Sequence, residues 1–442
     1  MIFLARYARI IVIAELIMAC VVIVGGCWGR TEVDDLALVM AIGLDNGEDD
    51  TVYVTLQMAV PRAVASGGGE GGRPGEGGGN EASLITTIRG RSILGLIDIA
   101  NTYINRRPSF VHCKLVVIGE DLAERGLAPH ISELVRFHEI RRTMFLVIAK
   151  GTAQEFIMAN KPILEQNPAK NLELLALASR KAGLIPSSQL HRFLVEMQSL
   201  GEGPLVILAG VNEEPSPEDD KQGKSKGAPQ ISVPISESDI DYIAGKSPSI
   251  GGNPIELAGA AVFRGDKMVG EITGEEVRYV LYLRGIFKRG VTIVQDPFAY
   301  DQLIAADLRL ARPTQIRVTR DGNRFHISVK ILLEGGLIGS QGTEDYTDPK
   351  VVSAVEEQLI HQIERGCRDI IRKAQTRFSS DIFAFGNKAR HLTLTWKEWQ
   401  NLDWPNEFPQ ASVSVTVGVE LRRTGLLFRS PTPLTSPQSP AS

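Results

Sequence analysis

Apolar positions in the first half of the chain recur with periods that predict alternating strands and helices. Residues 52–60 alternate between aliphatic side chains and Tyr, Thr, Gln or Ala, which predicts a half-buried strand. Strands are expected within 36–60 and at 114–119 and 144–149. Helices are expected at 93–104, at 121–137 with an interruption near Gly126 and Pro129, and over most of 170–200. This order predicts helices packed on a sheet.

The second half of the chain shows a similar mixture of periods. Arg264-Gly265-Asp266 separates two short apolar runs and predicts a β-hairpin. Two capping-box sequences open helices, one at Thr152 to Glu155 and one at Thr273 to Glu276. Asp348 followed by Pro349 predicts the start of a long helix that reaches about Thr376. Further strands are expected at 289–294, 314–319, 324–334 and 413–421.

Composition divides the chain into segments. Residues 67–79 hold nine glycines in thirteen positions, which predicts a surface insertion. Residues 213–254 are rich in Pro, Gly, Ser or charge and predict a linker or a small middle subdomain. The expected segments are a signal peptide, an N-terminal domain, this middle segment, a C-terminal domain and a disordered tail: 1–26, 27–212, 213–254, 255–429 and 430–442. We therefore predict an α+β fold with mixed sheets and packed helices in two main domains.

The N-terminus predicts lipid attachment. Arg6 and Arg9 precede an apolar run that ends in small residues just before Cys27, a pattern typical of a bacterial lipoprotein signal. Cleavage would leave Cys27 as the first residue, carrying diacylglyceryl and N-acyl chains. Two alternatives stay open. The 17-residue run at 10–26, interrupted by Glu15, could be an uncleaved membrane anchor, or the segment could be a plain secretory signal.

Charge and cysteine content exclude several classes of protein. The net charge of −4 argues against nucleic-acid binding. Four cysteines are too few for a disulfide scaffold. Cys113 and Cys367 are expected to be unpaired, although a disulfide between them stays open.

The search for catalytic or metal-binding motifs leads to no site. A G-x-G-x-x-G match at 67–72 arises from low complexity, and a G-x-S-x-G match at 223–227 lies in the charged linker. The histidines offer no H-E-x-x-H motif, and we expect His130 and His138 to be ordinary surface or half-buried residues. We predict no enzyme, no metal and no cofactor beyond the lipid on Cys27.

Two features are candidates for an interface. Three of the four tryptophans, Trp396, Trp399 and Trp404, lie within nine residues. They could pack a helix on a sheet, or they could anchor a partner or a membrane surface. Arg141 and Arg142 form a basic pair that could be a solvated face or a contact to lipid headgroups or a membrane partner.

Several ordered segments resemble one family. Residues 26–45, which begin Gly26-Cys27-Trp28, resemble the start of the Ger(x)C family, the lipoprotein C subunits of spore germinant receptors. Residues 112–126 and 139–151 are similar to its N-terminal domain, and 257–263, 381–386 and 396–425 to its second conserved region. Gly29 departs from the family, which usually carries an acidic residue after Cys-Trp.

The resemblance implies a non-catalytic subunit tethered by Cys27 to the outer face of the spore inner membrane. It implies two integral-membrane partners, an A-type subunit and a permease-like B subunit, in a complex that senses nutrients and triggers germination. The alternative is a lipid-anchored solute-binding protein of a transporter, which needs a ligand cleft between domains. A third class, an envelope hydrolase, needs a catalytic constellation in one pocket.

Overall fold

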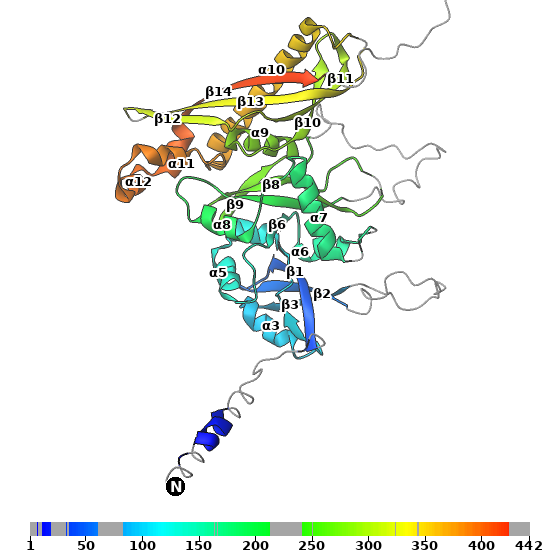
Figure 1. The fold of residues 1–442 in the computed structure, drawn as a ribbon, viewed down its shortest axis with the longest axis vertical. Helices are drawn as coiled ribbons and strands as arrows, with labels where there is room; N and C mark the ends of the chain where they lie inside the picture. The colour runs from blue at the N-terminus through cyan, green and yellow to red at the C-terminus, as the bar shows by residue number, and fades with distance from the viewer. Residues whose placement is uncertain are drawn as a thin grey trace, which may run out of the picture.

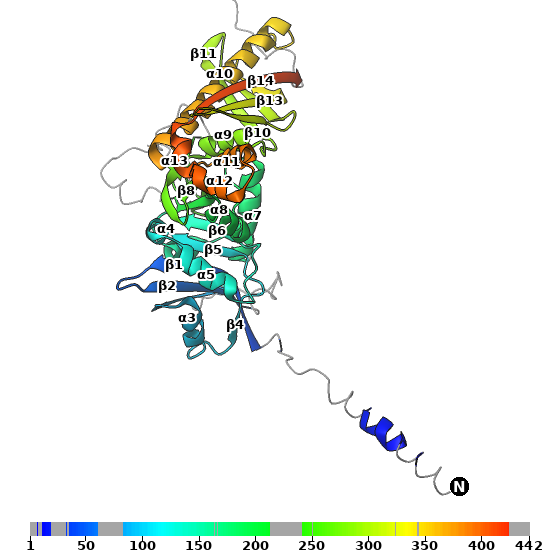
Figure 2. The same ribbon diagram turned by 90° about the vertical axis from the view of Figure 1, so that its left-hand side faces the viewer.

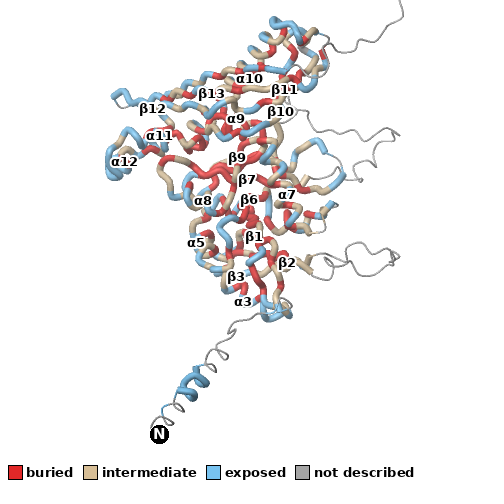
Figure 3. Tube along the Cα trace, in the orientation of Figure 1, coloured by how far each residue is buried: buried red, intermediate tan, exposed pale blue. Residues whose placement is uncertain are grey.

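The computed structural model describes residues 35–60, 83–212 and 241–423, apart from 163, 166, 250, 323 and 343, together with residues 7, 11–18 and 32. These residues form two β-sheets that follow one another along the long axis of the molecule, each with packed helices (Figure 1). Buried residues run through both sheets (Figure 3). The predicted mixed α+β class is confirmed.

The first sheet has nine strands. Eight of them run in the order β3-β2-β1-β5-β6-β7-β8-β9, and the short β4 pairs with β1. The strands are β1 (Leu36–Asn46), β2 (Val52–Ala59), β3 (Ser83–Gly90), β4 (Arg107–Ser109), β5 (Leu115–Gly119), β6 (Phe145–Ala149), β7 (Leu205–Val211), β8 (Ile255–Arg264) and β9 (Lys267–Ile272). The hairpin predicted around Gly265 is β8–β9, and β8 pairs with β7. The expected domain boundary at 255 therefore does not separate the two sheets.

The centre of this sheet is parallel and buried on both faces. β1, β5, β6 and β7 pair in parallel, and every residue of β5 and β6 is buried. Val116 and Ile118 point into one apolar cluster, while Leu115 and Val117 point into another. The helices of this half are α3 (Ile93–Ala100), α4 (Glu120–Arg125), α5 (Ala128–Arg136), α6 (Ala153–Ala159), α7 (Pro168–Lys181) and α8 (Leu190–Met197).

One prediction about β2 is wrong. The alternation suggested a half-exposed strand, but Thr55 and Gln57 are buried. Helix α6 packs here so closely that a Cβ on Gly43 would lie 2.9 Å from Ile157 Cδ1 and 3.1 Å from Thr55 Cβ. The Thr55 hydroxyl is satisfied by the hydroxyl of Thr87 on β3, at 2.9 Å.

The second sheet has five strands around the long β13. They are β10 (Gly290–Asp296), β11 (Ala299–Leu310), β12 (Gln315–Asp321), β13 (Arg324–Ser340) and β14 (Ser412–Arg423). β11 and β12 pair antiparallel with β13, and β14 pairs with it in parallel. Helices α9 (Gly274–Arg284) and α10 (Pro349–Lys373) pack against this sheet. Both predicted capping boxes and the predicted cap of α10 by Asp348 are confirmed.

Helix α10 also protects strand β14. Glu364 Oε1 accepts the Val417 N–H at 3.1 Å, and Glu356 Oε1 accepts the Leu421 N–H at 2.7 Å. These donors have no strand partner, because β13 pairs with the other side of β14. The helix thereby satisfies part of an edge that could otherwise pair with another chain.

A short helical segment follows α10. It contains the π-helical turn η3 (Ala374–Phe378), α11 (Gly386–Ala389), the 3-10 turn η4 (Arg390–Leu392), α12 (Trp396–Leu402), α13 (Trp404–Glu407) and the 3-10 turn η5 (Phe408–Gln410). We call residues 379–411 the helical arm. It lies at the side of the molecule, below β12 in Figure 1.

The buried carboxylate of Asp381 fixes the helical arm. Its Oδ2 accepts the Trp404 indole N–H at 2.9 Å and the Gly386 N–H at 2.7 Å, and its Oδ1 accepts the Phe383 N–H at 3.1 Å. The Asp381 carbonyl accepts the Gly203 N–H at 2.8 Å, which ties the arm to the residues just before β7. Burial raises the pKa of this carboxyl from 3.8 to about 6, although the three donors act to lower it.

The helix crossing of α9 and α10 gives a first prediction. A Cβ on Gly366 would lie 2.2 Å from the Tyr279 ring, whereas a Cβ on Gly95 in α3 would meet nothing closer than 3.6 Å. Gly366→Ala should lower the free energy of unfolding by roughly 1–3 kcal/mol despite its better helix propensity. Gly95→Ala is the matched control and should be neutral or stabilising by up to about 1 kcal/mol. Chemical denaturation measures both, and equal effects would contradict the packing seen at Gly366.

Asp381 gives a second prediction. Asp381→Asn should lower the free energy of unfolding by roughly 1–3 kcal/mol. The amide NH₂ would point at an N–H group whose hydrogen bond the carboxylate accepts, and two donors cannot bond each other. The folded chain holds the Asp381 proton more tightly than the unfolded chain, since its pKa is raised to about 6. The stability that the folded chain gains from this tighter proton binding is complete below about pH 4, and it is lost as the pH rises through about 6.

The difference in unfolding free energy between wild type and Asp381→Asn, measured against pH, checks whether Asp381 has this raised pKa. Denaturation of wild type and Asp381→Asn between pH 4 and 7 should show the wild-type advantage changing across this window. Parallel curves would show that Asp381 does not titrate there.

Candidate functional site

The expected lipid-attachment residue, Cys27, lies outside the described residues. The first described strand begins at Leu36, nine residues later. No helix in the described part of the chain is long and apolar enough to cross a membrane. Attachment through Cys27 therefore stays a prediction from the sequence.

The three clustered tryptophans have different environments. Trp399 and Trp404 are 2% and 1% exposed and stack with ring centroids 6.3 Å apart. Trp404 also packs edge-on against Phe325 of β13. Trp396 is 53% exposed. Burial leaves Trp399 and Trp404 no surface for a partner, so the contact role predicted for this cluster falls on Trp396.

Trp396 belongs to an exposed apolar loop that the sequence analysis did not identify. We call Leu392, Leu394 and Trp396 the apolar ridge; their exposed fractions are 47%, 96% and 53%. Helix α12 begins here with a capping box, which the sequence analysis did not predict. The spacing of Thr395 and Glu398, which is that of a capping box, is the sequence signal that could have located the start of α12.

The apolar ridge is held in a fixed conformation. Thr395 Oγ1 accepts the Glu398 N–H at 3.2 Å, and Glu398 Oε2 accepts the Leu394 N–H at 2.9 Å. The Arg390 guanidinium lies over the Trp396 ring, 5.1 Å from its centroid. The backbone at Leu394 is thus tied down while its side chain faces solvent, an arrangement that suits insertion into an apolar phase.

Arg141 and Arg142 are both exposed, which fits a solvated face as well as a contact surface. They lie between α5 and β6, and the Arg142 carbonyl accepts the His191 N–H of α8 at 2.8 Å. The pair is therefore supported by α8. Helices α5, α8 and α12 are drawn one above another in Figure 2; the basic pair follows α5 in the chain, and the apolar ridge leads into α12.

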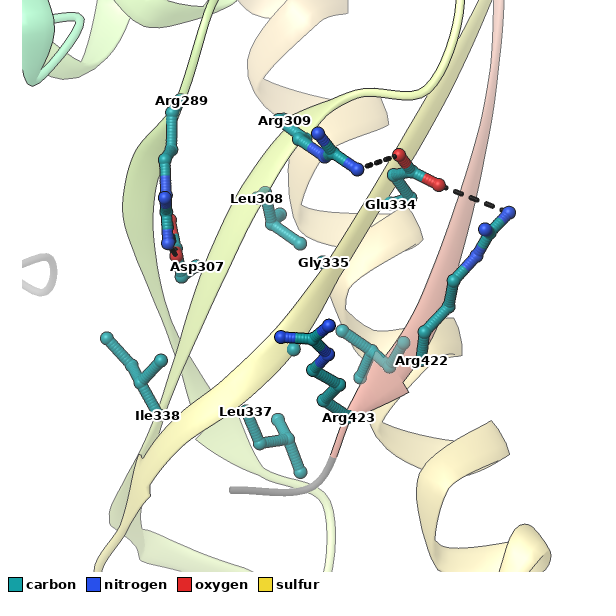
Figure 4. Close-up of a pocket in the computed structure, with 12 residues that line it drawn as sticks. Arg289, Asp307, Leu308, Arg309, Glu334, Gly335, Leu337, Ile338, Arg422 and Arg423 are labelled. Atoms are coloured by element: carbon teal, nitrogen blue, oxygen red, sulfur yellow. Dashed lines mark hydrogen bonds and ion pairs between the residues drawn. The ribbon is translucent and has the colours of Figure 1, made fainter. Parts of the chain in front are cut away.

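A separate pocket of about 900 Å³ lies in the second sheet, where β11, β13 and β14 meet (Figure 4). Glu334 Oε1 pairs with Arg309 at 2.7 Å, and Glu334 Oε2 pairs with Arg422 at 3.1 Å. Asp307 pairs with Arg289. Arg423 forms no ion pair within the described part of the chain, so four arginines face two carboxylates.

Glycine makes the floor of this pocket. A Cβ on Gly335 would lie 2.1 Å from the Asp307 carbonyl oxygen, so only glycine lets β13 approach β11 this closely. The pairing of β13 with β14 shifts register at Gly335 and Gly336. The polar side chains of the pocket are four arginines and the two acids that pair with three of them.

The described residues contain no group of three or more His, Cys, Asp or Glu arranged to hold a metal. Cys113 and Cys367 are unpaired and buried. Burial raises the pKa of the Cys113 thiol to about 12, so this thiol is not a nucleophile at neutral pH.

Comparisons with known proteins identify the family. Residues 29–209 match the family described as "Spore germination protein N-terminal domain", and residues 258–425 match "Spore germination B3/ GerAC like, C-terminal". The two matches together span most of the chain and occur in the expected order. The resemblance to the Ger(x)C family is thereby confirmed.

Relatives that match the chain over nearly its whole length support the same family. The chain is 25% identical to spore germination protein KC of Bacillus subtilis (strain 168), over 94% of this chain and 96% of the relative. It is 22% identical to spore germination protein YndF of the same organism, over 96% and 98%. The crystal structure of the GerBC protein is 15% identical, covers 86% of this chain and 96% of its own, and has a TM-score of 0.49. The chain belongs to the GerAC family of spore germination proteins.

Proposed function

We propose that this chain is the lipid-anchored C subunit of a nutrient germinant receptor in the spore inner membrane. Cys27 carries the lipid, on the outer face of that membrane. The subunit assembles with an A-type integral-membrane subunit and a permease-like B subunit, and the complex triggers germination. Its own role is contact and assembly rather than catalysis.

The position of Cys27 carries the proposal. The N-terminal family match begins at residue 29, two residues after Cys27, and the apolar run ends just before it. A lipoprotein signal peptide removed at this point would leave the whole family-matched region intact. Two acyl chains would then hold the protein at the bilayer, where a single chain would bind only weakly.

The pocket in the second sheet does not favour the alternative of a solute-binding protein. That class requires a ligand site between two domains. The arginine-lined pocket instead lies within one sheet, among β11, β13 and β14. The features that stand out are exposed surfaces: the apolar ridge and the Arg141–Arg142 pair.

The function of Cys27 is tested by Cys27→Ala in the full chain. The variant should lose incorporation of labelled fatty acid, leave the spore membrane fraction and slow the germination response to nutrients. The described fold begins after this position, so its thermal unfolding should not change. Cys20→Ala is the matched control, because Cys20 lies inside the segment expected to be removed. An acylated or fully functional Cys27→Ala protein would contradict the proposal.

A further inference from the structure

One side of the molecule carries four helices from distant parts of the chain. Figure 2, seen from the left-hand side of Figure 1, shows α12, α8, α5 and α3 one below another, and Figure 1 shows that α12 extends farthest toward that side. The hydrogen bond from His191 N–H to the Arg142 carbonyl joins the start of α8 to the loop after α5, and α3 packs against α5. We call this side of the molecule, including the apolar ridge and Arg141–Arg142, the helical flank.

The apolar ridge lies at one end of the helical flank. Leu394 is 96% exposed, and Leu392 and Trp396 are about half exposed on either side of it. Helix α8 adds Val195, which is 53% exposed. A fixed convex ridge with an almost fully exposed leucine is costly in water unless something covers it.

Positive charge surrounds the apolar ridge. Lys388, Arg390 and Lys397 are all exposed within five residues of it, and Glu398, which caps α12, is the one acidic residue in the same stretch. Arg136, Arg141 and Arg142 continue the positive charge on the α5 side.

We propose that the helical flank rests on an anionic lipid surface and that the apolar ridge inserts into it. Leucine and tryptophan at a convex tip, ringed by Lys and Arg, combine apolar burial with attraction to anionic headgroups. A protein partner would instead have to supply a deep apolar groove with an acidic rim. The inference rests on the proposed function for the presence of the bilayer but not for the contact itself.

The proposed lipid anchor agrees with this orientation. Nine residues separate Cys27 from the start of β1. An extended segment of that length spans about 30 Å at most, so the first sheet stays close to the bilayer. The flank then gives the chain a second attachment, which fixes its orientation as a lipid tether alone would not.

A fluorescent probe at the ridge tests the contact. The acylated full-length Leu394→Cys protein is labelled with an environment-sensitive dye and reconstituted into vesicles of phosphatidylcholine with 30% phosphatidylglycerol. Labelling is selective because Cys113 and Cys367 are buried. The control is Phe298→Cys, which is 50% exposed between β10 and β11, two strands labelled well away from α12 in Figure 1.

The dye at position 394 should shift its emission to the blue and be quenched by brominated lipid chains, while the dye at 298 should show neither effect. The shift at 394 should be largely lost in pure phosphatidylcholine and in a variant that adds Arg390→Gln and Lys397→Gln. Emission at 394 that equals emission at 298 in anionic vesicles would overturn the proposal.

A blue shift at 394 that occurs only in native spore membranes would also overturn it and would assign the ridge to a protein partner. Failure of the proposed function can be distinguished from failure of the lipid contact. In that case Cys27 is not acylated, and a Cys20→Ala, Cys27→Ala background keeps the dye on position 394, so the same vesicles measure the ridge alone.

Discussion

The hydrogen bonds of the buried Asp381 carboxylate are the interaction on which the exposed surfaces depend. They hold Trp404, Gly386 and Phe383 around one charge and so fix the helical arm. The arm in turn positions the apolar ridge through the capping box of α12. The apolar ridge keeps one conformation although Leu394 is almost fully exposed, because the helical arm that carries it is buried and hydrogen-bonded around Asp381.

The two sheets use different ways to protect themselves from unwanted pairing. The first sheet buries its parallel centre under helices on both faces, with β3 and β9 at its ends. In the second sheet, Glu356 and Glu364 of α10 accept two N–H groups of β14. The apolar ridge, by contrast, lies at the surface with cations around it.

The sequence predicted the elements whose local signals agree with their tertiary setting. The capped helices α6, α9 and α10 and the alternating strand β14 are examples. Strands β3, β7 and β11 were not predicted. β7 is a short apolar run that does not distinguish a buried strand from a helix, and β11 contains Ala and Asp, which are weak strand formers. Both segments become strands because they pair with strands that are distant in the sequence.

The candidate site was only partly predictable for the same reason. Clustering singled out three tryptophans, but packing against Phe325 and bonding to Asp381 place Trp404 in the core and leave Trp396 outside. Leu392 and Leu394 look like interior residues in the sequence, since exposed leucines have no local signature. The Asp381 carboxylate gave no signal either, because its partners come from positions up to 23 residues away.

The proposal that this chain is a membrane-bound receptor subunit is tested most directly by affinity purification of the native chain from detergent-solubilised spore membranes, with identification of the proteins that co-purify. We expect an A-type subunit and a permease-like subunit in fixed ratio to this chain. Recovery of transporter components with a bound solute, or of this chain alone, would contradict it.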